Sequence, residues 1–382
     1  MPSTNPSAAA PRARIAVIAG TRPECLKLAA LLAPLRARFD VYLVNSGQHP
    51  DMVARTFEHL GIKCDVTLPP PPAPATLSRT VRHLRDGVRL ALDSFRPAAV
   101  IVQGDTSTAY AGALAGRLAG VPVAHVEAGL RTHDPMRPFP EEPFRRRIAP
   151  IARWHFAPTA GAKANLVAEG FSDGVHVVGN TIIDLLRTNL ASRDSGPCPV
   201  RWREKFRTLV TLTLHRRENY GRGLDTVCEA MRGVLDDRPD VGIVCPVHPN
   251  PTVGARVRRA LSGHHRAILT EPMPYRPFLR LLGESALVVT DSGGIQEEAP
   301  YLGVPAIVVR EETERPECLA TGFVRLVPPQ RDLLRMEIER ALDAPRPRAV
   351  AFDEHAPFGD GRSGERIASI LAQALAPAGA TA

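Results

Sequence analysis

The sequence predicts an α/β protein built from two Rossmann-like domains, and three observations support this prediction. Short apolar runs rich in Val, Ile and Ala alternate with helical patterns. The alternation occurs in two series, separated by a stretch of Pro, Gly and Ser near 192–199. The runs are apolar almost throughout, which is typical of parallel strands that helices cover on both faces. Such a pair of domains is expected to bind its ligand in the cleft between them.

Each series contains six expected strands. In the first they cover 14–20, 41–47, 99–105, 121–129, 155–159 and 175–180; in the second they cover 208–215, 241–248, 266–272, 286–294, 305–311 and 323–328. We therefore expect a disordered tail at 1–13, an N-terminal domain at 14–181 joined by a returning C-terminal segment at 360–382, and a C-terminal domain at 182–359. The proline-rich stretch at 68–78 is expected to be a stiff surface connection.

Composition excludes several classes of function. The chain of 382 residues is 44% hydrophobic, but no apolar run approaches the roughly 20 residues of a membrane span. The net charge of +8 comes mostly from scattered Arg, with few aromatic residues, so nucleic acid is not an expected partner. Arg side chains suit an anionic small molecule instead. The six Cys form no CxxC pair or zinc-type spacing, which predicts free thiols in a reducing cytoplasm and no metal.

Polar residues follow almost every expected strand. In the first series they are "GTRPE" (20–24), "GDTST" (104–108) and "EAGLRT" (127–132); in the second they are "HRREN" (215–219), "HPNP" (248–251) and "DSGGIQEE" (291–298). Because ligands bind at the carboxyl ends of parallel strands, this shared placement predicts a functional site. Arg22 lies at the first strand-to-helix turn, where it is either a phosphate ligand or a surface charge.

The stretch "TDSGGIQEEA" combines small residues with the start of a helix. Ser292, Gly293 and Gly294 would let a phosphate approach the backbone N–H groups there, although an ordinary helix cap has the same pattern. Glu297 and Glu298 suit the helix dipole and could equally hold ribose hydroxyls. The chain lacks GxGxxG and GxxxxGK[ST], which argues against a nicotinamide cofactor and against an NTPase.

The segment from His125 to Arg147 concentrates charge, with Glu127, Glu141 and Glu142 among five Arg. Such a cluster is either a solvated surface or a set of acids and bases placed for chemistry on an anionic substrate.

Taken together, these stretches resemble the non-hydrolysing bacterial UDP-N-acetylglucosamine 2-epimerases. The matching motifs run in family order from about residue 14 to 330 and include "GTRPECLKLAALL", "QGDTSTAYAGALAG", "HVEAGLRT", "PFPEE", "VGNTIIDLL", "HRREN", "PVHPNP", "DSGGIQEEAP" and "TERPE". The resemblance implies a glycosyltransferase-B-like architecture, a nucleotide-sugar ligand and no cofactor. It also implies epimerisation at C2 of a UDP-2-acetamido sugar, most simply UDP-N-acetylglucosamine to UDP-N-acetylmannosamine. The route would be anti elimination of UDP to 2-acetamidoglucal, followed by syn re-addition.

The resemblance also assigns site residues. Asp105, Glu127 and Glu141 match the acid/base carboxylates, and Arg145 and His215 match the catalytic Arg and His that bind the diphosphate. The positions that match UDP-binding or cleft-lining segments are Arg22, Lys27, His248, Tyr275, Phe278, Ser292, Gly293, Gly294, Glu298, Arg310, Glu314 and Arg315. Glu142, Arg146 and Arg147 are expected to be helix-surface or structural charges.

Several positions depart from the family pattern. Phe144 stands where Asn is usual, so a polar contact near the site is expected to be missing or moved. Gln103 replaces a common His before Gly104 and Asp105. The segment at 68–78 replaces a polar loop where many members bind a second UDP-sugar as an activator, so we expect that activation to be weak or absent.

Three alternatives share these motifs. A hydrolysing 2-epimerase would release UDP and free N-acetylmannosamine, a glycosyltransferase would require an acceptor, and a sensor would bind the UDP-sugar without turnover. Other 2-acetamido sugars are possible substrates. A cytoplasmic homodimer is expected.

Overall fold

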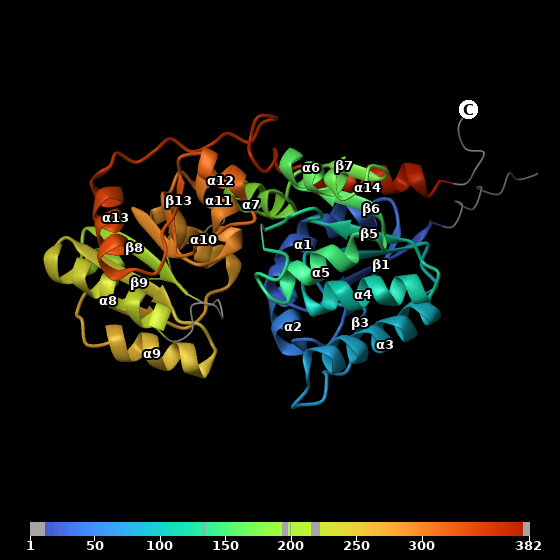
Figure 1. The fold of residues 1–382 in the computed structure, drawn as a ribbon, viewed down its shortest axis with the longest axis horizontal. Helices are drawn as coiled ribbons and strands as arrows, with labels where there is room; N and C mark the ends of the chain where they lie inside the picture. Colours follow the sequence, from blue (N-terminus) through green and yellow to red (C-terminus); the bar gives the residue numbers. More distant parts are fainter. Residues whose placement is uncertain (1–11, 133, 193–197, 199, 215–221, 377–382) are drawn as a thin grey trace, which may run out of the picture. The chain divides into compact units, whose positions relative to one another are not determined.

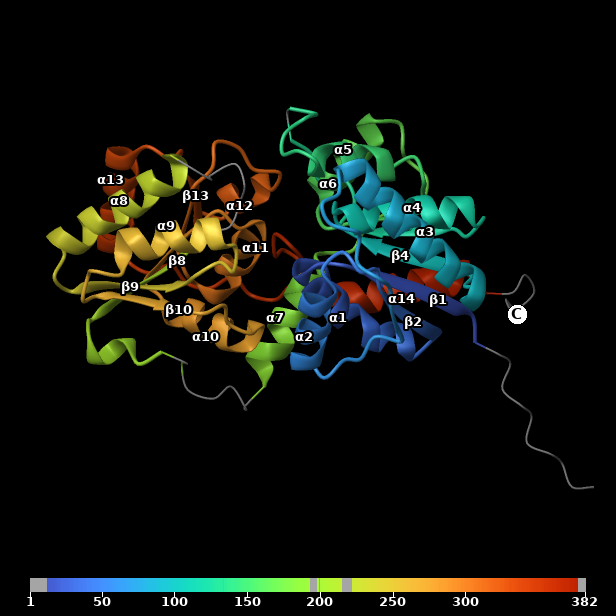
Figure 2. The same cartoon turned by 90° about the horizontal axis from the view of Figure 1, so that it is seen from below.

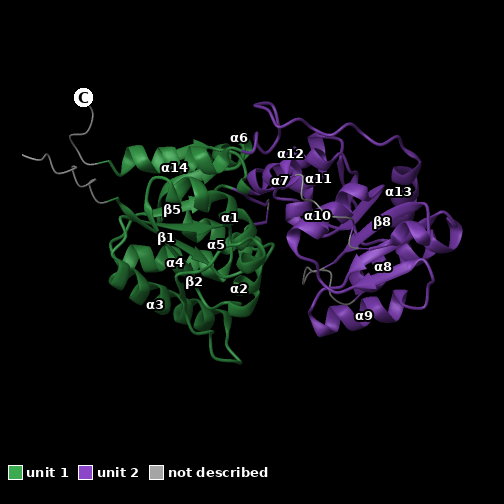
Figure 3. Ribbon diagram, turned by 180° about the vertical axis from the view of Figure 1, so that it is seen from behind, with its two compact units in different colours: residues 1–129, 135–181, 362–382 green, residues 130–134, 182–361 purple. Residues whose placement is uncertain are grey.

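The structure, a computed structural model, describes residues 12–132, 134–192, 198, 200–214 and 222–376 (Figure 1). The chain divides into two compact units (Figure 3). Unit 1 comprises Met1–Gly129, Pro135–Thr181 and Arg362–Ala382, and unit 2 comprises Leu130–Asp134 and Ile182–Gly361. Each unit contains one parallel sheet flanked by helices, which confirms the predicted fold class.

Unit 1 holds a seven-stranded sheet in the order β3-β2-β1-β4-β5-β6-β7. Its strands are β1 (Arg14–Ala19), β2 (Asp40–Asn45), β3 (Val66–Thr67), β4 (Ala99–Gln103), β5 (Val123–Val126), β6 (Ala152–Ala157) and β7 (Val175–Val177). Its helices are α1 (Arg22–Arg36), α2 (Pro50–His59), α3 (Leu77–Phe95), α4 (Ser107–Leu118), α5 (Glu141–Ile148), α6 (Ala160–Ala168) and α14 (Ser363–Ala374).

Alternating residues of β1 pack on opposite faces of this sheet. Ile15 and Val17 join a core cluster with residues of α1, α2 and α14, whereas Ala16 and Ile18 join a second cluster with residues of α3 and α4. Side chains of a strand point alternately to its two faces, so a strand covered by helices on both sides must be apolar at every position. This explains the continuous apolar run that predicted β1.

The C-terminal helix α14 belongs to unit 1, and it lies beside α1 in Figure 2. Its residues Ile367, Ala368 and Leu371 are fully buried in the same cluster as Leu28 and Leu32 of α1. Burying a side chain as large as that of Ile367 or Leu371 stabilises the fold by about 2 kcal/mol. Helix α14 is therefore part of the helical cover of the N-terminal sheet.

Unit 2 holds a six-stranded sheet in the order β10-β9-β8-β11-β12-β13. Its strands are β8 (Thr208–Thr213), β9 (Val241–Pro246), β10 (Ala267–Thr270), β11 (Leu287–Thr290), β12 (Ala306–Val308) and β13 (Val324–Leu326). Its helices are α7 (Thr181–Ala191, whose first residue falls in unit 1), the 3₁₀ helix η1 (Trp202–Glu204), α8 (Arg222–Asp237), α9 (Pro251–Leu261), α10 (Tyr275–Glu284), α11 (Gly293–Leu302), α12 (Pro316–Ala320) and α13 (Arg331–Asp343).

Most observed strands end before the predicted ones. The predicted strand at 99–105 ends at Gln103, and the one at 286–294 ends at Thr290. The polar residues that follow have left the sheet and form the turns into α4 and α11. The short strand β3 was not predicted, because Val66–Thr67 is too short to form a pattern.

The strand orders place a switch point in each unit, where successive connections leave the sheet in opposite directions. In unit 1 the switch lies between β1 and β4, and in unit 2 it lies between β8 and β11. Loops at the carboxyl ends of such strands form the usual ligand sites of this fold. The predicted motifs at 20–24, 104–108 and 291–298 follow β1, β4 and β11.

Candidate active site

The turns after β4 and β5 have a backbone conformation that few residues adopt. Gly104 has φ +70° and Glu127 has φ +65°. A left-handed conformation costs a residue with a side chain on the order of 1 kcal/mol, so the surrounding structure must hold Glu127 in place. Nε2 of His125 donates a hydrogen bond of 2.7 Å to the carbonyl oxygen of Gly104, which joins the two strand ends.

The carboxylate of Glu127 is buried and held through both of its oxygens. Nζ of Lys27, on α1, lies 2.5 Å from Oε1, and Nε2 of Gln103 donates a hydrogen bond to Oε2. The three residues are at most 7% exposed. A cation and an amide donor at these positions fix the orientation of the carboxylate. Lys27, which the resemblance assigns to UDP, forms an ion pair with Glu127 here.

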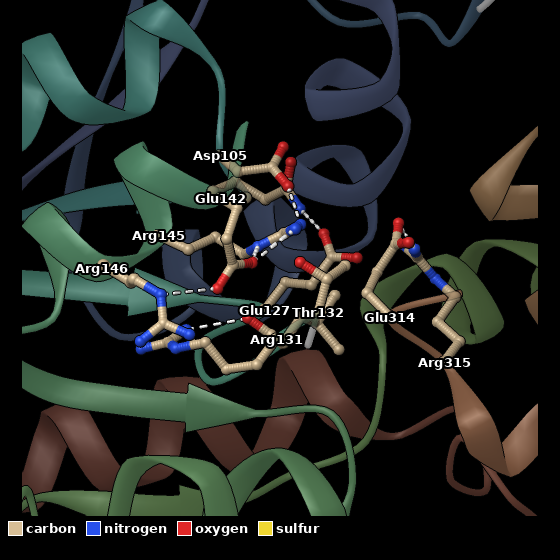
Figure 4. Close-up of polar contacts among 12 residues, drawn as sticks. Asp105, Glu127, Arg131, Thr132, Glu142, Arg145, Arg146, Glu314 and Arg315 are labelled. Atoms are coloured by element: carbon tan, nitrogen blue, oxygen red, sulfur yellow. Dashed lines mark hydrogen bonds and ion pairs between the residues drawn. The ribbon is translucent and has the colours of Figure 1, made fainter. Parts of the chain in front are cut away.

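Arg145 is the centre of a second buried charge cluster (Figure 4). Its Nη1 donates to Oδ2 of Asp105 at 2.5 Å, and its Nε donates to Oε2 of Glu142 at 2.8 Å. The side chains of Arg145 and Glu142 are 2% and 0% exposed, whereas that of Asp105 is 27% exposed. The structure therefore brings the predicted residues Asp105 and Arg145 into direct contact and leaves Asp105 accessible.

Glu142 was expected to be a helix-surface or a structural charge; it is fully buried, so the first alternative is wrong and the second agrees with its ion pairs. Besides Arg145, its carboxylate contacts Nε of Arg146 at 2.9 Å. The sequence could not reveal this, because acidic residues in the first turn of any helix are favoured by the helix dipole. Glu141, the neighbouring predicted carboxylate, is half-buried and lies one helical turn before Arg145, on the same side of α5.

Glu24 is a further buried carboxyl that the sequence did not single out. It lies in α1, is 1% exposed, and accepts hydrogen bonds from the backbone N–H of Gly20 at 2.9 Å and from Oγ1 of Thr106 at 2.5 Å. It thereby links the turn after β1 to the turn that carries Asp105. Burial raises the pKa of Glu24 to about 7, although these hydrogen bonds oppose the shift. Arg22, two residues earlier, is half-buried at the first position of the same helix.

Phe144 packs away from the charge cluster that contains the adjacent Arg145. It is 2% exposed, stacks on Tyr110 with ring centroids 5.0 Å apart, and joins Val81 and Leu84 in a small core cluster. This aromatic position joins α5 to α3 and α4. The residue that departs from the family pattern therefore has a packing role, and its neighbour Arg145 keeps its carboxylate partners.

In unit 2 the first turn of α11 is built from small residues. Ser292 precedes the helix, and Gly293 and Gly294 are its first two residues. A Cβ on Gly294 would meet no described atom within 4 Å, whereas a Cβ on Gly293 would lie 2.8 Å from Nη1 of Arg315. The helix N-terminus therefore presents backbone N–H groups with open space beside Gly294, the arrangement that phosphate groups bind.

Two predicted residues are in contact beside this helix. The hydroxyl of Tyr275, on α10, donates a hydrogen bond of 2.5 Å to Oε1 of Glu298 on α11, and both side chains are buried. Burial and the adjacent Glu298 carboxylate hold the pKa of Tyr275 well above its ordinary value, so its hydroxyl stays protonated. Phe278 packs on the core cluster around Trp202, and Nδ1 of half-buried His248 accepts from the backbone N–H of Asn250 at 3.2 Å.

Arg315 belongs to a buried ion network. Its Nε lies 2.5 Å from Oε1 of Glu297, and its Nη1 contacts Glu314, which also accepts from Arg310 at 2.9 Å. All four side chains are less than 9% exposed. Glu297 therefore holds the arginine next to Gly293.

The remaining expectations concern His215, metal binding and membrane-spanning helices. His215 and the rest of its "HRREN" motif (215–219) lie outside the described residues. Among the residues that are described, no group of three or more His, Cys, Asp or Glu side chains could hold a metal ion. Within the same ranges, every helix is too short or too polar to cross a membrane.

Comparison with known proteins identifies close relatives. The family model described as UDP-N-acetylglucosamine 2-epimerase matches residues 34–372. A probable UDP-N-acetylglucosamine 2-epimerase of Ralstonia nicotianae is 39% identical over 370 residues, which cover 94% of this chain and 98% of the relative. The UDP-N-acetylglucosamine 2-epimerase of Escherichia coli K12 is 36% identical, with 94% and 98% covered.

A solved structure agrees with these matches. The crystal structure of UDP-GlcNAc 2-epimerase from Neisseria meningitidis bound to UDP-GlcNAc superposes with a TM-score of 0.88 at 33% identity. It covers 94% of this chain and 100% of the Neisseria chain. The similarity thus extends over both units.

Proposed function

Because the chain belongs to the UDP-N-acetylglucosamine 2-epimerase family, we propose that it interconverts UDP-N-acetylglucosamine and UDP-N-acetylmannosamine and keeps UDP on the product. The observation that best supports this reaction is the pair of charge clusters after β4 and β5. They provide buried, partnered carboxylates at Glu127 and Glu142 and an accessible one at Asp105, with Arg145 between Glu142 and Asp105.

The proposed chemistry is an elimination followed by an addition. A carboxylate removes the C2 proton, the C–H electron pair forms the C1=C2 double bond, and the C1–O bond breaks with its pair leaving on UDP. UDP then adds back to C1 while a carboxylic acid delivers a proton to the opposite face of C2. The C2 proton is only weakly acidic, so the reaction needs a positioned base and acid and cationic stabilisation of the departing diphosphate.

We assign the acid and base roles to Asp105, Glu127 and Glu141 as a group. Lys27 and Gln103 bind the two oxygens of Glu127 and fix the position of its carboxylate, and a base must be positioned to remove the C2 proton. Asp105 is ion-paired to Arg145 but accessible, which suits a group that exchanges a proton with substrate. Arg145 and His215 are assigned to the diphosphate.

The UDP moiety is assigned to the N-terminus of α11. Its backbone N–H groups and the space beside Gly294 suit the phosphates, and the buried Glu298 suits the ribose hydroxyls. Ser292 and Gly293 line the same turn, while Tyr275 fixes the orientation of Glu298. The resemblance further implies a cytoplasmic homodimer, which sedimentation would show as twice the mass of the chain.

Product analysis tests the retention of UDP. The purified protein is incubated with UDP-N-acetylglucosamine, and sugar nucleotides are separated from free sugars by chromatography. The proposal expects a mixture of two UDP-sugars with no net release of UDP. Stoichiometric UDP and free N-acetylmannosamine would instead identify a hydrolysing epimerase, and turnover that required an added acceptor would identify a glycosyltransferase.

A further inference from the structure

Gln103 is the last residue of β4, and it belongs to the face of the sheet that helix α1 covers. Ala99 and Ile101, which share its side of the strand, pack in the core cluster that contains Leu28 of α1. Gln103 is 2% exposed, so its amide is out of bulk water. A buried amide needs hydrogen-bond partners, and its Nε2 donates to Oε2 of Glu127.

The backbone of Glu127 explains why such a donor matters. Ala124 and Val126 of β5 pack in the α1 cluster, so strand alternation would direct residue 127 to the opposite face. The left-handed conformation at φ +65° ends the alternation, and the carboxylate reaches the α1 side, where Lys27 and Gln103 bind it. The two contacts therefore hold a carboxylate whose backbone conformation is unfavourable by itself.

We propose that Gln103 is a positioning residue for Glu127, whose neutral amide fixes one carboxylate oxygen while Lys27 fixes the other. The inference rests on the proposed epimerase function and adds to it a residue that acts through Glu127. An amide carries no charge at any pH, so the charge of residue 103, next to the Lys27–Glu127 pair, does not change with pH. A histidine at residue 103 would donate the same hydrogen bond but gain a positive charge as pH falls through its titration range.

Other charged groups act on the same site and set the background for any pH measurement. They are Lys27 and Glu24 on α1, Asp105 after β4, His125 and Glu127 at the end of β5, and Arg145 on α5. All of them are unchanged in a Gln103 variant. The ratio of variant to wild-type activity at each pH therefore isolates the effect of residue 103.

Two substitutions test the proposal against wild type. Gln103→Met keeps the length of the side chain and removes the donor. A misplaced catalytic group costs up to about 100-fold, so we expect kcat to fall by about 10- to 100-fold with KM within about threefold. Gln103→His restores a donor, so we expect it to recover part of kcat and to show a kcat ratio to wild type that changes between about pH 5.5 and 7.5. The ratio for Gln103→Met is expected to be constant over that range.

Controls separate this inference from the proposed function. Gln373→Met makes the same change at an exposed position of α14 in the same unit and is expected to keep wild-type kinetics. Circular dichroism and UDP binding by calorimetry check that each variant is folded. If wild type does not epimerise, the proposed function fails. If wild type does epimerise and folded Gln103→Met keeps full kcat, or if Gln103→His has a pH-independent ratio, the positioning role is wrong.

Discussion

The carboxylate cluster of unit 1 and the first turn of α11 in unit 2 lie at corresponding positions of their own sheets, but they are built from different chemical groups. The carboxylate cluster comprises Lys27, Gln103, Asp105, Glu127, Glu142 and Arg145, and both regions follow strands next to a switch point. The carboxylate cluster uses side chains, all charged except the neutral amide of Gln103, and each is fixed by a buried partner. The first turn of α11 uses backbone groups and the absence of a side chain at Gly294.

This difference predicts where substitutions act. Proton transfer requires side chains with defined charge and position, so changes in the carboxylate cluster should lower kcat. Binding of a diphosphate to a helix N-terminus requires space and backbone N–H groups, so changes at α11 should raise KM and weaken UDP binding. The first and last of the following predictions test this division, and the two between them test the buried carboxyl groups of unit 1. They run from the largest expected effect to the smallest.

The largest effect is expected for Asp105→Asn. The amide keeps the shape of the side chain but cannot exchange a proton, so kcat should fall by about 10²- to 10⁴-fold. UDP binding, measured by calorimetry, should stay within about threefold, since UDP is assigned to unit 2. Asp173→Asn, at an exposed loop position of unit 1, is the matched control. Full turnover by folded Asp105→Asn would rule out a proton-transfer role for this residue.

The second prediction concerns the buried partner of Arg145. Glu142→Ala leaves the guanidinium with one fewer carboxylate in a buried site, which typically lowers the free energy of unfolding by about 3–5 kcal/mol. Urea denaturation measures this change. Glu169→Ala removes a partly exposed partner of Arg146 and should cost less than about 1 kcal/mol. Equal losses in the two variants would show that burial of Glu142 does not matter.

The third prediction is a pH dependence of stability. Burial raises the pKa of Glu24 from its ordinary 4.5 to about 7, so between these values the folded chain binds this proton more tightly than the unfolded chain. The stabilisation is therefore fully present below about pH 4.5 and is lost as pH rises to about 7, a change of about 3 kcal/mol. Glu24→Gln should remove this dependence.

Urea denaturation of wild type and Glu24→Gln at a series of pH values gives the comparison. The other carboxyl groups cancel in the difference between the two proteins. The wild type should lose stability relative to the variant as pH rises from about 5 to 8. A difference that is constant with pH would mean that the pKa of Glu24 is not raised by burial.

The smallest effect is expected at α11. Alanine at Gly294 fills open space and suits a helix better than glycine, so the free energy of unfolding should rise by about 0.5–1 kcal/mol. The same methyl group would occupy the proposed phosphate position, and UDP affinity should fall by about tenfold with kcat nearly unchanged. Calorimetry with UDP measures the affinity.

Gly293→Ala is the comparison for that variant. Its methyl group would lie 2.8 Å from Arg315, which is paired with Glu297, so this substitution should destabilise the fold. Unchanged UDP affinity in Gly294→Ala would move the phosphate site away from this helix.

Much of the fold could be predicted from the sequence because buried parallel strands must be apolar throughout. The strand ends were less accurate, since polar residues such as Asp105 and Ser292 belong to the turns that follow. For the site, motif order predicted Asp105 and Arg145, which the structure brings into contact. The burial of Glu142 and Glu24 could not be predicted, because an acidic residue in the first turn of a helix is common in exposed helices as well.

Phe144 and Lys27 show a second limit of sequence reasoning. Phe144 was expected to leave a polar contact missing or moved, and the structure adds that its ring stacks on Tyr110, on a side of α5 that the sequence alone does not define. Lys27 was assigned to UDP, and the structure adds a contact with Glu127 that the sequence did not suggest, since helix α1 passes the end of β5. Contacts between residues 100 positions apart depend on packing, which no local pattern in the sequence reports.

Deuterium incorporation tests the central claim most directly. The protein is incubated with UDP-N-acetylglucosamine in deuterated water, and the sugar nucleotides are examined by NMR. Removal and return of the C2 proton predicts deuterium at C2 of UDP-N-acetylmannosamine, with UDP still attached to C1. A UDP-linked manno product with hydrogen retained at C2 would contradict proton transfer by the carboxylate cluster.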